Sequence, residues 1–389
     1  MRVAQVIDGL RLGGGAEQLQ VSFAEAVQNR PVDLSILTIN RNHPSILEML
    51  RDLGVEVRAF PADSFLSPIR AARFVRHVRQ EGFDLLHTHL VRSTLLGGLA
   101  GRLCDVPVVS TIHNTQHDRK LPWLLRAAEG RILRRGVDRV VAVGWQTAAA
   151  HAAWLHPRTL DVIPNAVRPF DPAWVRGREE LRHSLGASKC DRVLISVGRL
   201  HLQKGYGDLI EAFERLRGGR HPNLKLWIVG AGGLREALTQ DVQRRGLGDA
   251  IRLLGLREDV PRLLAASDLY VSSAHWEGLP LSILEAMSAG LPVVATTVGD
   301  VPRIVDDRNG RLAPPADPLA LAEALDTALA DPARLASWGE EGRRRAHEEF
   351  GVEAWADRIL RLYEDVLREH RRRRNPVAEP GRGGVTCGS

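Results

Sequence analysis

Residues 269–297 read LYVSSAHWEGLPLSILEAMSAGLPVVATT. The stretch begins with an apolar, strand-like run (269–274), and a second such run covers residues 292–299. Between them, HWEGLP indicates a loop, and LSILEAMSAG indicates a helix that ends at Gly290. Pro280 fits the first turn of that helix, where a missing backbone N–H costs nothing. A strand, a helix and a second strand in this order predict a parallel βαβ unit.

The same alternation continues along the whole chain. In the first half, apolar runs predict strands at 3–8, 32–39, 55–60, 84–89, 107–113, 139–144 and 160–165; in the second half, they do so at 192–198, 224–230, 251–255, 269–274 and 292–299. Nearly continuous apolar strands separated by amphipathic helices are typical of parallel sheets that helices cover on both faces. Since each half has its own set, the pattern predicts an α/β protein with two doubly wound domains.

A stretch without strand character separates the two halves. Residues 164–191, PNAVRPFDPAWVRGREELRHSLGASKCD, are rich in proline, glycine and charge, as linkers are. We therefore expect a first domain (1–165), a linker (166–190), a second domain (191–350), a C-terminal helix (351–374) that packs back toward the first domain, and a disordered tail (375–389).

Composition restricts the function classes. Of the 389 residues, 44% are apolar and 26% are charged, as in ordinary globular proteins. The three cysteines form no CxxC pattern, which argues against a disulfide framework or a zinc site. Without a secretory or membrane-spanning segment, a cytoplasmic location is expected. The net charge of +6 is concentrated in residues 1–165 and in the tail, and suits either an anionic surface or a solvated, arginine-rich one.

Two charged pairs follow strands of the second half, where parallel sheets bind ligands. Arg199 and Lys204 flank the loop of SVGRLHLQKGYGDLIEAF (196–213) and would form a clamp for a diphosphate at a helix N-terminus, or else two surface cations. Glu277 lies in the loop after residue 274, and Glu285 lies about one turn into the next helix. Two carboxylates there suit the hydroxyls of a ribose and a sugar ring, although a capping and a surface glutamate explain them too.

Glycines and histidines mark the strand ends of the first half. In DGLRLGGGAEQL (8–19), the residues Gly14 and Gly15 would let backbone amides approach a phosphate. The loop matches neither a Walker A motif nor GxGxxG, so a turn that binds nothing stays open. His87, His89 and His113 end predicted strands, and His113 is the best placed, because its strand is central. Half-buried histidines with ordinary hydrogen bonds are the alternative, and nearby carboxylates for a metal site are lacking.

Together these motifs resemble the retaining GT-B glycosyltransferases of the large group 1 set, glycosyltransferase family 4. EGLPLSILEAMSAGLPVVAT resembles the E-x7-E signature, SVGRLHLQKGYGDLI the GR…KG loop, and GGGAEQ the N-terminal glycine loop; DLLHTH, STIH and VIPNAV follow in the family's order. The resemblance covers about residues 1–350. It implies the GT-B architecture, in which two Rossmann-like domains face each other across a cleft, with the acceptor bound by the first domain and the nucleotide sugar by the second.

The resemblance also implies a role for each site residue. Arg199 and Lys204 would bind the donor diphosphate, Glu277 would hold the transferred sugar, and His113 would lie near its reacting face. The expected donor contacts are Glu285 for the ribose, Leu256 and Arg257 for the base, the loop residues Gly278, Leu279, Pro280 and Leu281 for the sugar, and Gly14 and Gly15 for the phosphates.

The implied reaction is transfer to a saccharide or lipid-linked saccharide with retention at the anomeric carbon, in cell-surface polysaccharide or glycolipid synthesis. The leaving phosphate would assist front-face attack, and no metal or other cofactor is expected. The chain departs from the family at two points: Asn165-Ala-Val-Arg168 stands where Asn-Gly-Val-Asp is common, and Gly144 stands where serine is common.

Basic helical patterns in the first half suggest how the acceptor is reached. Arginines recur every third residue from Arg70 to Arg79, and RKLPWLLRAAEGRILRRG (119–136) places cations around an apolar stretch; the candidate contacts are Arg119, Lys120, Trp123, Arg131, Arg134 and Arg135. This pattern is typical of a helix that lies on an anionic membrane surface, here the inner face of the cell membrane. A helix packed by its apolar face, with its basic face in water, is equally consistent with it.

Other functions remain open at this stage. A GT-B nucleotide-sugar 2-epimerase would share the cleft but would need no acceptor, and the combination of E-x7-E with GR…KG argues against it. A basic, non-catalytic protein that binds polyanions or membranes is an alternative from another class, but no specific nucleic-acid motif is present.

Overall fold

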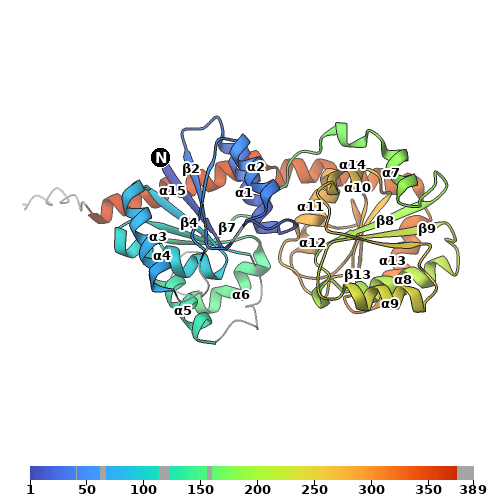
Figure 1. Ribbon diagram of the computed structural model, residues 1–389. Coiled ribbons are helices and arrows are strands. Elements are labelled where there is room, and N and C mark those ends of the chain that lie inside the picture. The colour runs from blue at the N-terminus through green and yellow to red at the C-terminus, as the bar shows by residue number, and fades with distance from the viewer. Residues whose placement is uncertain (41, 62–66, 114–122, 156–159, 375–389) are drawn as a thin grey trace, which may run out of the picture.

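The computed structural model describes residues 1–40, 42–61, 67–113, 123–155 and 160–374. The chain forms two parallel sheets, and each sheet has helices on both faces (Figure 1). In the described part of the chain, no helix combines the length and the apolar character that crossing a bilayer requires.

The first sheet has seven strands in the order β3-β2-β1-β4-β5-β6-β7, and every neighbouring pair is parallel. Its strands are β1 (Arg2–Ile7), β2 (Asp33–Thr38), β3 (Glu56–Ala59), β4 (Leu85–His89), β5 (Val108–Ile112), β6 (Arg139–Ala142) and β7 (Leu160–Val162). The strand order reverses direction between β1 and β4, so the carboxyl ends of these strands form a switch point where α/β sheets bind ligands.

Helices of the first domain cover the two faces of this sheet. One face packs against α1 (Gly15–Val27), α2 (Pro44–Asp52) and the C-terminal helix α15 (Val352–Arg374). The other face is covered by α3 (Pro68–Glu81), α4 (Val91–Cys104), α5 (Trp123–Arg135) and α6 (Trp145–Leu155). The sheet is thus buried on both sides, as its continuous apolar strands predict.

The second sheet has six parallel strands in the order β10-β9-β8-β11-β12-β13. They are β8 (Arg192–Val197), β9 (Leu224–Val229), β10 (Ile251–Gly255), β11 (Leu269–Ser272), β12 (Val293–Thr296) and β13 (Gly310–Ala313). Each strand range expected from the sequence contains a strand, so the fold class is confirmed. The edge strand β13 was not expected, because GRLA is short and not β-branched.

Helices of the second domain again form two layers. The helices α8 (Tyr206–Arg217), α9 (Arg235–Arg244) and α13 (Pro318–Leu329) cover one face. The other face is covered by α10 (Val260–Ala265), α11 (Leu281–Ser288), α12 (Val301–Ile304) and the end of α14 (Pro332–Phe350). Two short helices fall in the expected linker, η1 (Pro172–Val175) and α7 (Arg178–Ser184), and α7 is tied to the second domain because Arg178 and Arg182 both pair with Asp268.

The chain crosses between the domains twice, and the two crossings lie side by side. Val167 and Gly351 form a parallel backbone bridge, and the Val167 amide donates to the Phe350 carbonyl at 2.8 Å. After the second crossing, α15 returns along the first domain (Figure 1), where Trp355 packs edge-on against Phe23. The second domain is therefore joined to the first by two adjacent segments of the backbone.

Candidate active site

The glycine loop of the first domain lies directly against the second domain. A Cβ atom on Gly13 would contact Leu256 Cδ1 at 3.0 Å, and one on Gly15 would contact Leu281 Cδ1 at 3.1 Å. Gly13 also has a φ of 76°, which other residues rarely adopt. Glycine suits both positions because a side chain there would crowd these leucines of the second domain, and the loops after β1 and β11 therefore lie against each other.

Lys204 and Glu277 form an ion pair at this interdomain position. Lys204 ends the short helix η2 (Leu202–Lys204), and Gly205 then turns with a φ of 59°. A Cβ on Gly205 would collide with the Ser273 carbonyl, so glycine allows the loop to lie against the end of β11. Lys204 Nζ is 2.5 Å from Glu277 Oε1, and the side chains are 16% and 10% exposed. Glu277, expected only as a sugar ligand, is thus also the counter-ion of the expected phosphate ligand.

Arg199 faces the first domain across the same space. Its side chain is exposed and interacts electrostatically with Glu17 of α1. Burial raises the pKa of Glu17, whereas Arg11 and Arg199 lower it. A Cβ on Gly14 would collide with the Glu17 carboxylate, so this side chain folds over the amino end of α1. The helix end that the sequence assigns to phosphate through Gly14 and Gly15 therefore already holds a carboxylate, a residue that the sequence reasoning overlooked.

Glu285 lies one turn into α11 and is half-buried. Loss of hydration raises the pKa of Glu285 to about 7, and the nearby Arg168 opposes this shift. Arg168 is held by Glu25 of α1 through a 2.8 Å ion pair. The arginine that departs from the family pattern thus brings a positive charge to Glu285, although sequence reasoning gave it no site role.

The loop from Gly278 to Leu281 is anchored from both domains. The Gly278 carbonyl accepts from the Asp300 amide at 3.0 Å, and the Leu279 carbonyl accepts from Asn165 Nδ2 at 2.8 Å. A Cβ on Gly278 would stand 3.5 Å from the His113 carbonyl oxygen. These contacts bring His113, at the end of β5, next to the loop that carries Glu277. Pro280 precedes α11 as its N-cap residue.

His113 is neutral in this setting. Burial lowers the pKa of His113 to about 4, and its Nε2 lies 3.2 Å from Nδ1 of His89. An uncharged imidazole can accept a hydrogen bond from a hydroxyl, whereas an imidazolium cannot.

The Gly144 departure is explained by Asp300. A Cβ on Gly144 would collide with Asp300 Oδ2, and this buried carboxylate accepts from the Gln146 amide at 3.0 and 3.2 Å. Asp300 comes from the second domain and caps the start of α6 in the first. The position usually taken by serine is therefore filled by a carboxylate that no local sequence pattern identified.

Of the two residues expected to contact the nucleotide base, only one is free to do so with its side chain. Leu256 is 47% exposed and lies against Gly13. Arg257 donates twice to Asp259, at 2.7 Å each, and this pairing lowers the pKa of Asp259. The Arg257 guanidinium is therefore directed to its own loop, which leaves Leu256 as the apolar surface facing the first domain.

The basic surface of the first domain is only partly as expected. Arg70 is buried, so it does not belong to the exposed stripe; Arg73, Arg76 and Arg79 remain exposed. Trp123 at the start of α5 is 67% exposed, and Arg131, Arg134 and Arg135 are exposed on the same helix. Arg119 and Lys120 lie outside the described residues.

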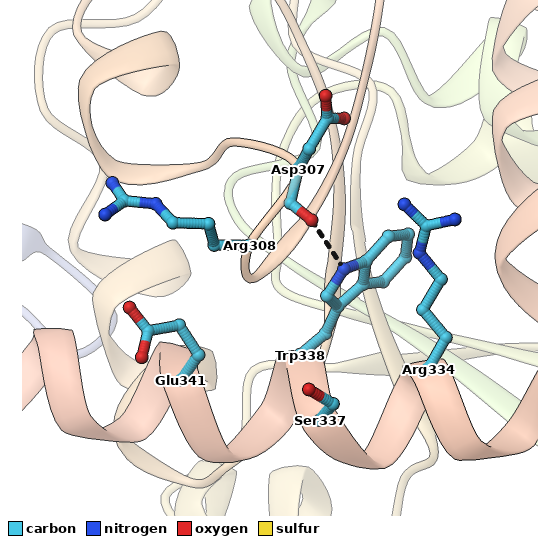
Figure 2. Close-up of a pocket in the computed structure, with 6 residues that line it drawn as sticks. All are labelled: Asp307, Arg308, Arg334, Ser337, Trp338 and Glu341. Carbon is cyan, nitrogen blue, oxygen red and sulfur yellow. Dashed lines mark hydrogen bonds between the residues drawn. The ribbon is translucent and has the colours of Figure 1, made fainter.

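A separate pocket lies between the start of α14 and the loop before β13 (Figure 2). Trp338 Nε1 donates to the Asp307 carbonyl at 2.9 Å, and the Arg334 guanidinium lies 4.9 Å from the centre of the Trp338 ring. Glu341 pairs with Arg344, and Arg308 pairs with Asp306. The Trp338 hydrogen bond thus fastens the loop before β13 to α14, and the site residues expected from the sequence all lie elsewhere.

Comparisons with known proteins agree with this geometry. The family model described as glycosyl transferases group 1 matches residues 177–345, and the model described as glycosyltransferase family 4 matches residues 13–169. The 2-deoxystreptamine glucosyltransferase of Streptomyces kanamyceticus is 31% identical over 74% of this chain and 79% of its own length. An Escherichia coli UDP-Gal:alpha-D-GlcNAc-diphosphoundecaprenol alpha-1,3-galactosyltransferase is 27% identical over 91% of this chain and 94% of its own.

Solved structures share the fold across both domains. Anabaena HepE in complex with UDP and glucose superposes with a TM-score of 0.82 at 22% identity, covering 94% of this chain and 100% of that chain. WaaG, a glycosyltransferase involved in lipopolysaccharide biosynthesis, superposes with a TM-score of 0.71 at 20% identity, covering 93% and 99%.

Proposed function

This chain belongs to the group 1 glycosyltransferases and has their GT-B architecture, and from this premise we propose that it transfers a sugar from a nucleoside-diphosphate sugar to a saccharide or lipid-linked saccharide, with retention at the anomeric carbon. The observation that carries the proposal is the ion pair of Lys204 and Glu277. It lies at the contact between the two domains, which we call the seam, near Arg199 of the second domain and His113 of the first. A charge-compensated pair in a largely buried place is costly to maintain without a use.

Each charged group has a place in the reaction. Breaking the bond from sugar to phosphate increases negative charge on the diphosphate, and Arg199 and Lys204 stabilise that charge from fixed positions, which is a role a metal ion would otherwise fill. Lys204 is then shared between the diphosphate and Glu277. The Glu277 carboxylate accepts hydrogen bonds from hydroxyls of the transferred sugar, and Glu285 accepts them from the ribose. The leaving phosphate takes the proton of the acceptor hydroxyl as this hydroxyl attacks from the same face.

The donor is best sought among uridine nucleotides. The Escherichia coli relative is named for UDP-Gal, and HepE was crystallised with UDP and glucose. A thermal-shift and hydrolysis screen against UDP-, GDP-, ADP- and dTDP-sugars tests this, with Glu285→Ala and Lys204→Ala as controls. We expect one class of nucleotide sugar to raise the melting temperature of the wild type and to be hydrolysed slowly by it, and we expect both effects to be lost in the two variants. The proposal fails if no nucleotide sugar binds, or if both variants hydrolyse the sugar as fast as the wild type does.

We further propose that the surface formed by α3, α4 and α5 approaches an anionic membrane. A groove between α3 and α4 is lined by Val75, Leu99 and Leu103, with Arg76 and Arg79 at its edge. Leu103 is 54% exposed, and Trp123 and Leu124 are exposed at the start of α5. Apolar side chains bordered by arginines suit the interface of anionic lipids, where a lipid-linked acceptor would be presented at the inner face of the cell membrane.

Liposome sedimentation tests this surface. Vesicles containing anionic lipid should retain the wild type at low salt, and neutralising Arg131, Arg134 and Arg135 together should abolish retention. Neutral vesicles serve as the control. Unchanged retention by the triple variant would refute the membrane contact and leave the proposed reaction standing with a soluble saccharide as acceptor.

The alternatives receive less support. Neither of the relatives named above is an epimerase, and the epimerase reading is therefore set aside. A non-catalytic, basic scaffold would have no need for the Lys204–Glu277 pair, and the donor screen separates it from an enzyme, since a scaffold would hydrolyse no nucleotide sugar.

A further inference from the structure

Six polar side chains form one continuous chain of hydrogen bonds through the first domain. The members, which we call the histidine relay, come from β1, β4, β5, the residue after β5, and α15: Gln5, His87, His89, Thr111, His113 and Tyr363. The distances are 2.7 Å from Thr111 Oγ1 to His87 Nε2, 2.5 Å from His87 Nδ1 to the Tyr363 hydroxyl, 3.0 Å from that hydroxyl to Gln5 Nε2, and 3.2 Å from His89 Nδ1 to His113 Nε2. Gln5 Oε1 contacts His89 Nε2 and closes the chain.

The direction of the hydrogen bonds on one side follows from Tyr363. Gln5 Nε2 donates to the Tyr363 oxygen. The single O–H of Tyr363 is then left to donate to His87 Nδ1. Since burial lowers the pKa of His87 to about 3, this ring carries one proton, which sits on Nε2 and is donated to Thr111.

The hydrogen bonds from Gln5 through His89 determine which nitrogen of His113 carries the proton. Gln5 Oε1 can only accept, so His89 carries its proton on Nε2. Burial also holds the pKa of His89 well below its usual range, and its bare Nδ1 must therefore accept from Nε2–H of His113. Because His113 is neutral as well, its Nδ1 carries no proton and is the ring's remaining hydrogen-bonding atom.

We propose that Gln5 and Tyr363 are positioning residues that fix His113 as the Nε2–H tautomer, so that Nδ1 accepts a hydrogen bond from a hydroxyl of the bound sugar or acceptor. The inference rests on the proposed function, because that function supplies the hydroxyl. Reversing the Gln5 amide would reverse every bond toward His113 and turn Nδ1 into a donor. The same reversal would require the Tyr363 hydroxyl to turn toward Gln5 Oε1 and His87 to carry its proton on Nδ1, so Tyr363 couples the Gln5 amide to the rest of the relay. A residue of α15, beyond the second crossing, thus takes part in setting the active-site tautomer.

The experiment combines nitrogen NMR of the imidazole rings with steady-state kinetics. The protein is labelled with ¹⁵N-histidine, and His113 is assigned by a His113→Asn variant. The wild type is expected to show Nδ1 bare and Nε2 protonated. In Tyr363→Phe, the Gln5 amide is no longer oriented, so His113 should populate both tautomers and kcat should fall about five- to tenfold, which is the effect of one hydrogen bond.

Thr88→Val is the matched control, because Thr88 is a buried hydroxyl on β4 that bonds outside the relay, to Thr94 and the Val109 carbonyl. It should lower the melting temperature while leaving the His113 tautomer and kcat unchanged. A wild-type His113 with its proton on Nδ1 would overturn the proposal, and that result needs no variant to fold. A single unchanged tautomer in Tyr363→Phe would overturn it too. If the wild type transfers no sugar, the proposed function fails, whereas the tautomer measurement still decides the relay.

Discussion

Replacing Lys204 by methionine should affect stability and catalysis by different mechanisms. The pair with Glu277 is nearly buried, with side chains 16% and 10% exposed. Removing one partner of a fully buried pair costs about 3–5 kcal/mol, and the residual exposure here reduces that to about 2–3 kcal/mol. For domains of this size each kcal/mol corresponds to roughly 2–4 °C, so the melting temperature should fall by about 5–10 °C. Loss of the cation facing the diphosphate should lower kcat by about 10²–10³-fold.

The double variant separates the two effects. In Lys204→Met combined with Glu277→Gln, no unpaired charge remains, so most of the lost stability should return. Activity should not return, because neither the diphosphate nor the sugar regains its ligand. The exposed pair of Lys189 and Glu179, 2.7 Å apart, provides the matched control, and Lys189→Met should change neither property.

The assays are differential scanning fluorimetry for stability and release of nucleoside diphosphate for activity. If the melting temperatures of the single variants simply add in the double variant, the pair is not coupled, and the assignment of Glu277 as counter-ion is wrong. If Lys204→Met keeps kcat within about threefold of the wild type, Lys204 does not stabilise the leaving group.

Glu285, Gly205 and Gly144 can each be tested by substitution. Burial raises the pKa of Glu285 to about 7, so the carboxylate is lost as the pH falls through 7. The donor KM should therefore rise about tenfold from pH 8 to pH 6, and Glu285→Gln should abolish this dependence. The contribution of Glu285 to folding stability has the opposite sense: it should decrease as the pH rises from 4.5 to about 7. Gly205→Ala forces a Cβ against the Ser273 carbonyl at positive φ and should cost about 2 kcal/mol or more by thermal denaturation, whereas Gly207→Ala, with open space around it, should cost nothing. Gly144→Ser should destabilise the protein by displacing Asp300, and Asp300→Ala in the same chain should relieve the collision, so a double variant less stable than Gly144→Ser would refute this account.

Most strands of the two sheets could be predicted because their apolar runs are nearly continuous and buried, although the edge strand β3 is largely exposed. β13 is the exception: its pairing with β12 aligns Gly310 with Val293 and Leu312 with Ala295. Nothing in GRLA itself favours a strand. Its position is set by the neighbouring edge and by α13, which packs across it, so this strand depends on tertiary contacts that a local pattern does not contain.

The site could be predicted as a set of residues but not as a set of contacts. Lys204 and Glu277 are 73 positions apart, and no local pattern indicates that they bind each other. Glu17 and Asp300 were overlooked for a related reason. The Glu17 carboxylate occupies the space beside Gly14, and the Asp300 carboxylate occupies the space beside Gly144. The sequence shows that each glycine lacks a side chain, but only the folded chain shows which carboxylate fills the space.

The two departures from the family pattern become intelligible once both domains are considered. Gly144 lacks the usual serine, and a carboxylate from the second domain occupies that space and caps α6. Arg168 stands where aspartate is common, next to the first crossing, and pairs with Glu25 of α1 while opposing the pKa rise of Glu285. In both cases a polar group at the seam is balanced by a group from the other side. These contacts therefore do more than hold the domains together: because Arg168 lowers the pKa that burial raises at Glu285, a change in how the domains sit would alter the charge of Glu285 without touching it.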